Sequence, residues 1–170
     1  SMKISTAVKT MSLDGDWRLN HFAFNEGDVR QITHQDFIPT GWMDAEVPGE
    51  VHLDLLRGGK IHGFYFGKDT NEYKWIEDED WWYWKEFFVP EDFRQDKVEL
   101  VFEGLDCFAT IWLNGIQIAT SANMFVPVVC DVTNKLQIGK RNVITVRLAS
   151  PIKSIEGKDV SQLYSTTSLD

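Results

Sequence analysis

Apolar residues alternate with polar ones in the second half of the chain, from about residue 97 onward, and this pattern most limits the possible folds. Successive side chains of a strand point to opposite faces, so such runs predict strands that are buried on one side. The runs KVELVFE (residues 97–103) and NVITVRLAS (residues 142–150) follow the pattern. The side chains predicted to face inward are Val98, Leu100, Phe102, Ile144, Val146 and Leu148, and those predicted to face outward include Thr145 and Arg147.

An Asn-Gly pair divides a further apolar stretch, ATIWLNGIQIA. Asn114-Gly115 readily adopts the positive φ angles of a type I′ turn, which predicts a hairpin of strands 108–113 and 116–120. Another strand is expected in MFVPVVCDV, where Pro127 lacks an amide donor and indicates a sheet edge or a bulge. Several short strands at regular spacing are typical of an antiparallel sandwich.

The first half is less regular, but it contains one clear strand pattern. In SLDGDWRLNHFAF, the side chains of Trp17, Leu19 and His21 fall on one face after an Asp-Gly turn. One helix is expected at about residues 48–57, where a proline suits the first turn and two glycines follow the last. The predicted fold class is therefore all-β, an antiparallel sandwich with one or two short helices.

Length and charge limit the domain count and the classes of partner. At 170 residues the chain is long enough for one domain with a core, which we place at 13–152, between an N-terminal extension (1–12) and a C-terminal segment (153–170). Its 26 acidic residues against 17 basic ones give a net charge of −9, which disfavours a nucleic-acid partner. No apolar run approaches the roughly 20 residues of a membrane span, and no signal-peptide core is visible, so we expect a cytoplasmic protein without a membrane segment.

No residue pattern indicates catalytic machinery, a metal or a cofactor. A glycosidase needs two carboxylates that flank a sugar, and no spacing singles out such a pair. The acidic run EDED at 77–80 lacks the alternating ligands and the turn glycine of a calcium loop, which favours a solvated loop over a cation site. The four histidines have no metal-ligand spacing, and Cys107 and Cys130 are expected to be buried, unbridged thiols.

Five blocks of sequence occur in an order and at spacings that are informative together. They are VPGEVHLDLLRGGKI, NEYKW, DWWYWKEFFVPEDF, VELVFEGLDCFATIWLNGIQIATSANMFVPVVCDVT and NVITVRLASPI. Within them lie the patterns W-Y-x-x-x-F-x-V-P (82–90), F-E-G-L-D (102–106), L-N-G (113–115) and D-V-T (131–133). These blocks resemble the N-terminal domain of glycoside hydrolase family 2 over about residues 13–152. NEYKW and the N-M-F at 123–125 resemble its β-mannosidase branch in particular.

The resemblance implies a jelly-roll sandwich that is the first domain of a longer enzyme. In that family, immunoglobulin-like modules and a (β/α)₈ barrel follow, and the barrel carries both catalytic glutamates of the retaining reaction. The parent protein is thus expected to be a β-mannosidase that acts on non-reducing terminal β-mannosides, with this chain inactive by itself. The W-D-W-G-P segment that helps β-mannosidases to hold the terminal mannose is not found in this chain.

The segment NEYKWIEDEDWWYWKEFF, residues 71–88, contains four of the chain's seven tryptophans. As a strand, residues 81–89 would be apolar on both faces, because the aromatic side chains at 81–84 alternate between them. Such a strand is buried on both sides, or another domain covers one side. A platform on which sugars stack is the alternative interpretation.

We assign different roles to four of these aromatic residues. Trp82 matches the family pattern and is expected in the core. Trp84 and Phe88 are expected to be exposed and to contact another domain. Trp75, just before the acidic run, is the best candidate for contact with a sugar.

Three functions remain open on sequence alone. The first is the accessory domain of a β-mannosidase-like hydrolase, with a β-galactosidase or β-glucuronidase relative as a variant. The second is a free-standing jelly-roll module that binds carbohydrate. The third is a structural or interaction domain, and self-association through the 81–88 face would favour this interpretation.

Overall fold

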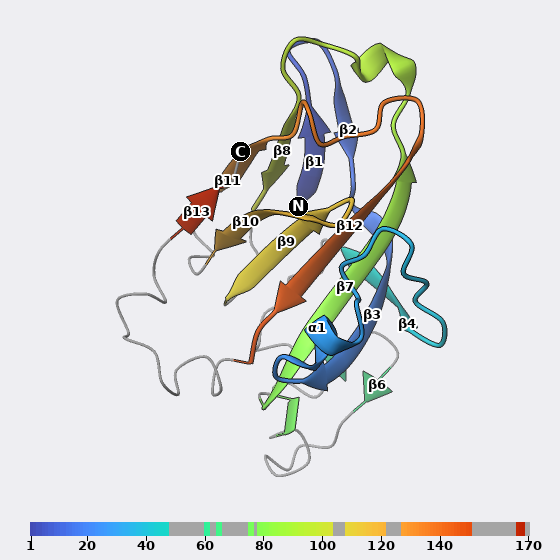
Figure 1. The fold of residues 1–170 in the computed structure, drawn as a ribbon, viewed down its shortest axis with the longest axis vertical. Coiled ribbons are helices and arrows are strands. Elements are labelled where there is room, and N and C mark those ends of the chain that lie inside the picture. Colours follow the sequence, from blue (N-terminus) through green and yellow to red (C-terminus); the bar gives the residue numbers. More distant parts are fainter. Residues whose placement is uncertain are drawn as a thin grey trace.

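The computed structural model describes residues 1–47, 60–61, 64–65, 75–76, 78–103, 108–121, 127–150 and 166–168. These residues form a jelly-roll-like antiparallel β-sandwich, and the short helix α1 (Glu26–Val29) lies in front of the larger sheet in Figure 1. The smaller sheet has the order β11-β8-β1-β2, with β1 (Met2–Ser5), β2 (Thr10–Ser12), β8 (Glu99–Phe102) and β11 (Val128–Asp131). The larger sheet has the order β13-β10-β9-β12-β7-β3-β4, with β3 (Gly15–Ala23), β4 (Met43–Val47), β7 (Glu79–Phe88), β9 (Ala109–Leu113), β10 (Ile116–Ser121), β12 (Arg141–Leu148) and β13 (Thr166–Ser168).

Two smaller elements complete the description. The strands β5 (Lys60–Ile61) and β6 (Phe64–Tyr65) pair with each other, and a 3₁₀ turn spans Glu91–Phe93. The all-β sandwich expected from the sequence is confirmed, while the helix predicted at about 48–57 lies outside the described residues. Within the described part of the chain, no helix is long and apolar enough to cross a membrane.

The main core fills the space between the two sheets. It contains all six side chains that the alternation predicts to face inward, each no more than 5% exposed. Trp17 and Leu19 of β3 lie in it as expected, and so does Cys130, whereas Cys107 lies outside the described residues. Thr145 was expected to face water, but it is only 1% exposed, because a second apolar layer covers the other face of the larger sheet.

Both chain segments that we set apart as extensions contribute strands to the sandwich. Residues 2–5 pair with β8 in the register Met2↔Phe102 and Ile4↔Leu100, and residues 10–12 pair with β1. Residues 166–168 pair with β10 as β13. Strands this short show little periodicity, and their partners lie far away in the sequence, so local pattern does not reveal them.

The Asn-Gly hairpin has the predicted geometry. Asn114 and Gly115 have φ angles of 50° and 84°, the positive values of a type I′ turn, between β9 and β10. The Asn114 side chain accepts a hydrogen bond from the Val143 amide at 2.9 Å and donates one to the Asn142 side chain at 2.8 Å. These bonds fix the turn to β12. The strand after Pro127 is also where expected, since β11 is an edge of the smaller sheet.

Strand β7 is buried on both faces from Asp80 to Trp84. Its neighbours in the sheet are β12 and β3. Trp81 and Tyr83 point into the main core, whereas Trp82 and Trp84 point to the other side. There they form the outer cluster, whose buried members are Ile32, Trp42, Trp82, Trp84, Trp112 and Val143.

The chain between β3 and β4 covers the outer cluster. Its helix α1 packs so closely on Trp82 that a Cβ on Gly27 would lie 2.1 Å from the indole ring. The rings of Trp82 and Trp112 stack with their centroids 5.5 Å apart. The ring centroids of Trp42 and Phe37 are also 5.5 Å apart. The outer cluster is therefore a second, smaller core.

The expectations for this strand are confirmed in part. Trp82 is fully buried, as expected for a core residue. Trp84 is only 7% exposed, so the expectation that it is exposed is wrong, because the covering segment buries it in the outer cluster. Phe88 lies beyond the covered region and is 60% exposed. Contact of either residue with another domain stays a prediction.

The described part of the acidic run is only partly exposed to solvent, because Asp78 is exposed whereas Glu79 and Asp80 begin strand β7. Asp80 is fully buried and accepts hydrogen bonds from the Ser150 amide at 2.8 Å and the Asn25 amide at 3.2 Å. Burial raises the pKa of the Asp80 carboxyl above its ordinary value, although the two amides and nearby Arg147 act in the opposite direction. Asp80 thus joins three chain segments that are distant in sequence.

We expect the change Trp82→Ala to destabilise the chain by about 3–5 kcal/mol, because it empties a large volume between α1 and the sheet. The indole N–H of Trp82 has no hydrogen-bond acceptor in the described structure, so the loss is one of packing. Urea unfolding followed by circular dichroism measures it. Phe88→Ala on the exposed end of the same strand is the control and should change stability by no more than about 0.5 kcal/mol. Equal effects of the two changes would contradict a buried second layer.

The raised pKa of Asp80 predicts a pH dependence of stability. The native state holds the Asp80 proton more tightly than the unfolded chain does, so the stabilising contribution is fully present below the unfolded pKa of 3.8. It is lost as the pH rises through the native pKa. Because Asp80→Asn cannot titrate, the parent's free energy of unfolding, relative to that of this variant, should fall as the pH rises above 3.8. If this difference in the free energy of unfolding instead rises with pH, the hydrogen bonds from the two backbone amides lower the pKa of Asp80 by more than burial raises it.

Candidate functional site

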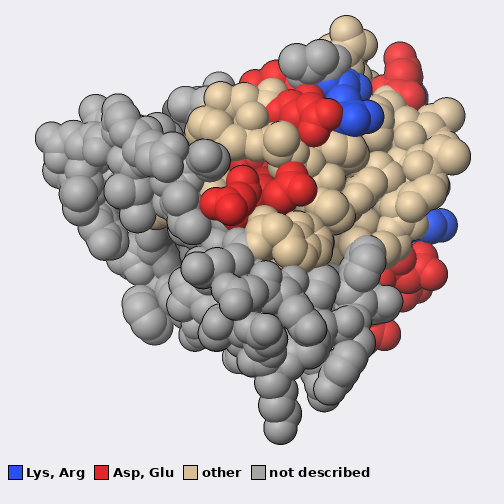
Figure 2. All heavy atoms as spheres, turned by 90° about the horizontal axis from the view of Figure 1, so that it is seen from below, with Lys and Arg blue, Asp and Glu red and all other residues tan. Residues whose placement is uncertain are grey.

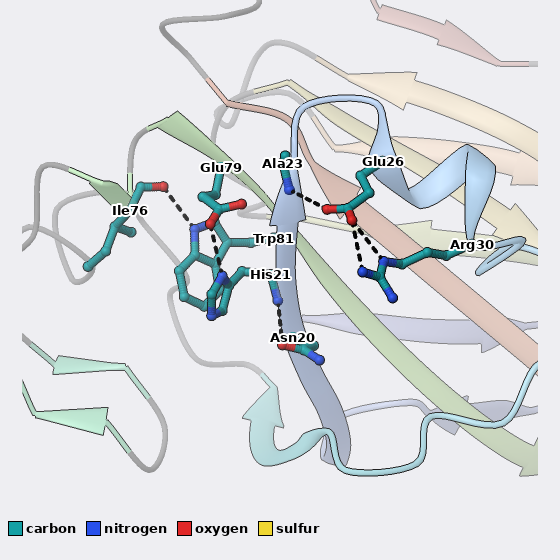
Figure 3. A network of polar contacts seen from close by, with 8 residues as sticks. All are labelled: Asn20, His21, Ala23, Glu26, Arg30, Ile76, Glu79 and Trp81. Carbon is teal, nitrogen blue, oxygen red and sulfur yellow. Dashed lines mark hydrogen bonds and ion pairs between the residues drawn. The ribbon is translucent and has the colours of Figure 1, made fainter.

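Four side chains meet where β3 ends and β7 begins, and we call them the His21 cluster: His21, Trp75, Glu79 and Trp81. The imidazole of His21 packs beside two indoles, with its ring centroid 4.9 Å from that of Trp75 and 4.8 Å from that of Trp81. The indoles of Trp75 and Trp81 are 5.9 Å apart. Glu79 completes the cluster with its Oε1 atom 3.3 Å from His21 Nδ1, as Figure 3 shows.

Strand register brings these residues together. In the β3–β7 pair, His21 lies opposite Trp81, and Ala23 lies opposite Glu79. The Trp81 indole N–H donates a hydrogen bond to the carbonyl oxygen of Ile76 at 2.9 Å, which fixes the ring and the chain beside Trp75 (Figure 3). The base of the cluster is therefore rigid, since Trp81 is 1% exposed.

The other three side chains of the cluster remain accessible. The His21 and Glu79 side chains are 28% and 26% exposed, and Trp75 is half-buried against the main core. A carboxylate accepts hydrogen bonds, an imidazole can donate or accept them, and an indole offers a flat apolar face. Sugar sites combine these groups, because a sugar has hydroxyls at its rim and C–H groups on its faces.

Acidic side chains outnumber basic ones among the described residues at this end of the sandwich (Figure 2). Figure 2 looks at the end where α1 and the start of β7 lie, and it shows more acidic than basic atoms among the described residues. The described acidic residues in α1 and around the start of β7 that reach the surface are Glu26, Asp28, Asp78 and Glu79. Glu26 forms an ion pair with Arg30, with 2.8 Å between Glu26 Oε1 and Arg30 Nη2, and the Arg30 guanidinium lies over the ring of Phe22.

Among the described carboxyls, burial raises the pKa of Asp80, whose carboxyl is buried against backbone amides rather than open to a substrate. No described group of three or more His, Cys, Asp or Glu side chains could hold a metal ion. What the cluster can do chemically is bind a polar, partly apolar ligand.

Of the site residues singled out from the sequence, Trp75 lies in the His21 cluster. Its neighbours His21 and Glu79 were not predicted as site residues. Trp75 lies beside His21 and Glu79, whereas Trp84 and Phe88 lie elsewhere on β7. The strand pattern placed His21 on the inward face of β3, but only the register with β7 shows that it meets Glu79. The contact of Trp75 with a sugar stays a prediction.

Comparisons with known proteins agree with the fold and with the sequence blocks. The family described as "Glycosyl hydrolase 2 galactose-binding domain-like" matches residues 21–167. The β-mannosidase of Capra hircus is 32% identical over 87% of this chain and 15% of its own length. β-Mannosidase B of Thermothelomyces thermophilus is 37% identical over 69% of this chain and 14% of its own length.

Solved structures extend the comparison. The β-D-mannosidase of Dictyoglomus thermophilum has 36% sequence identity and a TM-score of 0.64, over 86% of this chain and 16% of that one. A β-glucuronidase of Lactobacillus rhamnosus has a TM-score of 0.62 over 82% of this chain and 21% of that one, and at 23% identity it shares the fold alone. The chain spans about 15% of the length of the curated β-mannosidases that it matches. It belongs to the galactose-binding-like domain family of glycosyl hydrolase 2.

Proposed function

We propose that this chain is the non-catalytic N-terminal domain of a β-mannosidase that removes non-reducing terminal β-mannose from oligosaccharides. The observation that carries the proposal is the similarity to β-mannosidases over most of the chain, at 32% identity with the protein of Capra hircus and 36% with that of Dictyoglomus thermophilum. The chain matches only a small part of each of them. The catalytic glutamates then belong to a barrel domain that this chain does not contain.

In this proposal, the His21 cluster forms part of the rim of the sugar pocket. Trp75 stacks on the sugar, while Glu79 and His21 hydrogen-bond to its hydroxyls. The rigid base under Trp75 supports this role, because a fixed ring loses little entropy when a ligand binds. The catalytic barrel supplies the rest of the pocket.

Phe88, at the exposed end of β7, supplies a contact with the other domains. Phe88 is a large apolar side chain at 60% exposure, and another part of the enzyme would shield it from water. Trp84 offers little surface for such a contact, since it is 7% exposed. Without that partner, Phe88 would favour self-association of the chain.

A chimera tests the proposed role. This chain replaces the matching region of the Dictyoglomus thermophilum β-D-mannosidase, and turnover of nitrophenyl β-mannoside is measured. We expect an active chimera in which Trp75→Ala raises KM by about 2- to 10-fold, the effect of losing one aromatic contact of about 0.5–1.5 kcal/mol. kcat should stay nearly constant, because the contact is made in the ground state and in the transition state alike.

Two controls accompany the chimera. Ile116→Ala, at an exposed apolar position outside the cluster, should leave KM unchanged. The chain by itself should show no turnover of nitrophenyl β-mannoside or β-galactoside. A folded chimera whose KM is unchanged by Trp75→Ala would argue against the sugar contact. Turnover by the chain alone that disappears on mutation of one of its own acids would contradict a non-catalytic domain.

A further inference from the structure

A groove with a volume of about 1160 Å³ lies beside β4, the edge strand of the larger sheet. Side chains of β3 and β4 and the strand β7 line its floor, and residues 37–41 form its wall. The groove lies on the outer face of the sheet. Trp17 points into the main core, so its neighbours Asp16 and Arg18 point the other way.

The wall of the groove is a preformed set of turns. The Phe37 amide donates to the His34 carbonyl oxygen at 3.1 Å, and the Trp42 amide donates to the Pro39 carbonyl oxygen at 3.2 Å. The Phe37 ring packs on Trp42, which belongs to the outer cluster. A wall anchored in this way does not need to be ordered when a ligand enters, which lowers the cost of binding.

The floor presents charged groups of both signs, held in pairs. Arg18 pairs with Asp44 at 3.4 Å, and Arg141 pairs with Glu86 at 2.6 Å. All four side chains are accessible, from 46% exposed for Arg141 to 92% for Asp44. The charged lining residues on the outer face are Asp16, Asp44, Glu46 and Glu86 against Arg18 and Arg141, so carboxylates are in excess. The side chain of Lys85 lies on the inner face of β7, over the ring of Trp17.

This lining favours a neutral ligand that is rich in hydroxyls. The excess of carboxylates disfavours an anionic ligand. Carboxylates accept hydrogen bonds from hydroxyls, and guanidinium groups donate to them, so paired hydroxyls can bridge each ion pair. Phe37, Ile38 and Pro39 add an apolar wall for C–H groups, and Ile38 is 72% exposed. The volume exceeds what one sugar ring fills, since pockets of roughly 300–1,000 Å³ hold drug-sized ligands.

We propose that this outer groove binds a stretch of neutral oligosaccharide. The choice of a mannose-containing chain rests on the proposed function, whereas the ligand chemistry follows from the lining. The groove is a separate site from the His21 cluster. Arg18 and His21 lie on opposite faces of β3 and about 10 Å apart along it, at roughly 3.3 Å per residue.

Nuclear magnetic resonance titration of the 170-residue chain with β-1,4-linked mannotriose tests this site. Amide signals of residues 38, 40, 41 and 44–46 should shift and yield a Kd. Glu46→Gln keeps the shape of the lining but removes one carboxylate, and it should weaken binding at least about fivefold. Arg18→Ala should weaken binding similarly. Arg94→Ala, whose exposed side chain pairs with Glu91 away from the groove, is the matched control and should leave Kd unchanged.

The outcomes separate this proposal from the proposed function. Groove shifts that persist in Trp75→Ala and weaken in Glu46→Gln support the outer groove. No shift at the groove, or shifts confined to His21 and Trp75, would overturn it while leaving the sugar contact of Trp75 intact. A folded Glu46→Gln variant with an unchanged Kd would overturn it as well. The KM of the chimera depends on Trp75 and is unaffected by either result.

Discussion

The two-sided burial of β7 is the interaction on which the rest of this structure depends. Its adjacent residues Trp81 and Trp82 are 1% and 0% exposed, yet they lie in different cores. The main core holds the two sheets together. The outer cluster holds the chain between β3 and β4 against the larger sheet. A sandwich usually buries one face of each sheet and leaves the other in water, so the second layer sets this domain apart.

Both candidate sites follow from that arrangement. At the start of β7, alternation sends Glu79 and Trp81 to the inner face beside His21, and sends Asp80 to the outer face, where backbone amides meet it. The outer cluster anchors Trp42 and Phe37, which in turn fix the wall of the groove. One aromatic strand thus supports the His21 cluster at its start and the groove on its outer face.

The sequence predicted those features that depend on neighbours along the chain. Alternation found the inward residues of β8 and β12, and the Asn-Gly pair found the hairpin. Features that depend on distant segments were missed. The burial of Trp84 and Asp80 requires the segment around α1, and the meeting of His21 with Glu79 requires the β3–β7 register. The short strand β1 becomes recognisable only beside β8. Alternation shows that a face is apolar, but it does not show what covers it.

Native-state hydrogen exchange of the backbone amides tests the central claim most directly. If β7 joins two cores, its amides at 81–87 should exchange only through global unfolding, together with those of β9 and β12. The amides of α1 should open at lower free energy without releasing β7, because the main core still holds the strand. A β7 that exchanges at the same low free energy as α1, while β1 and β8 stay protected, would contradict the account. It would show that the outer layer, rather than the two cores together, determines the stability of this strand.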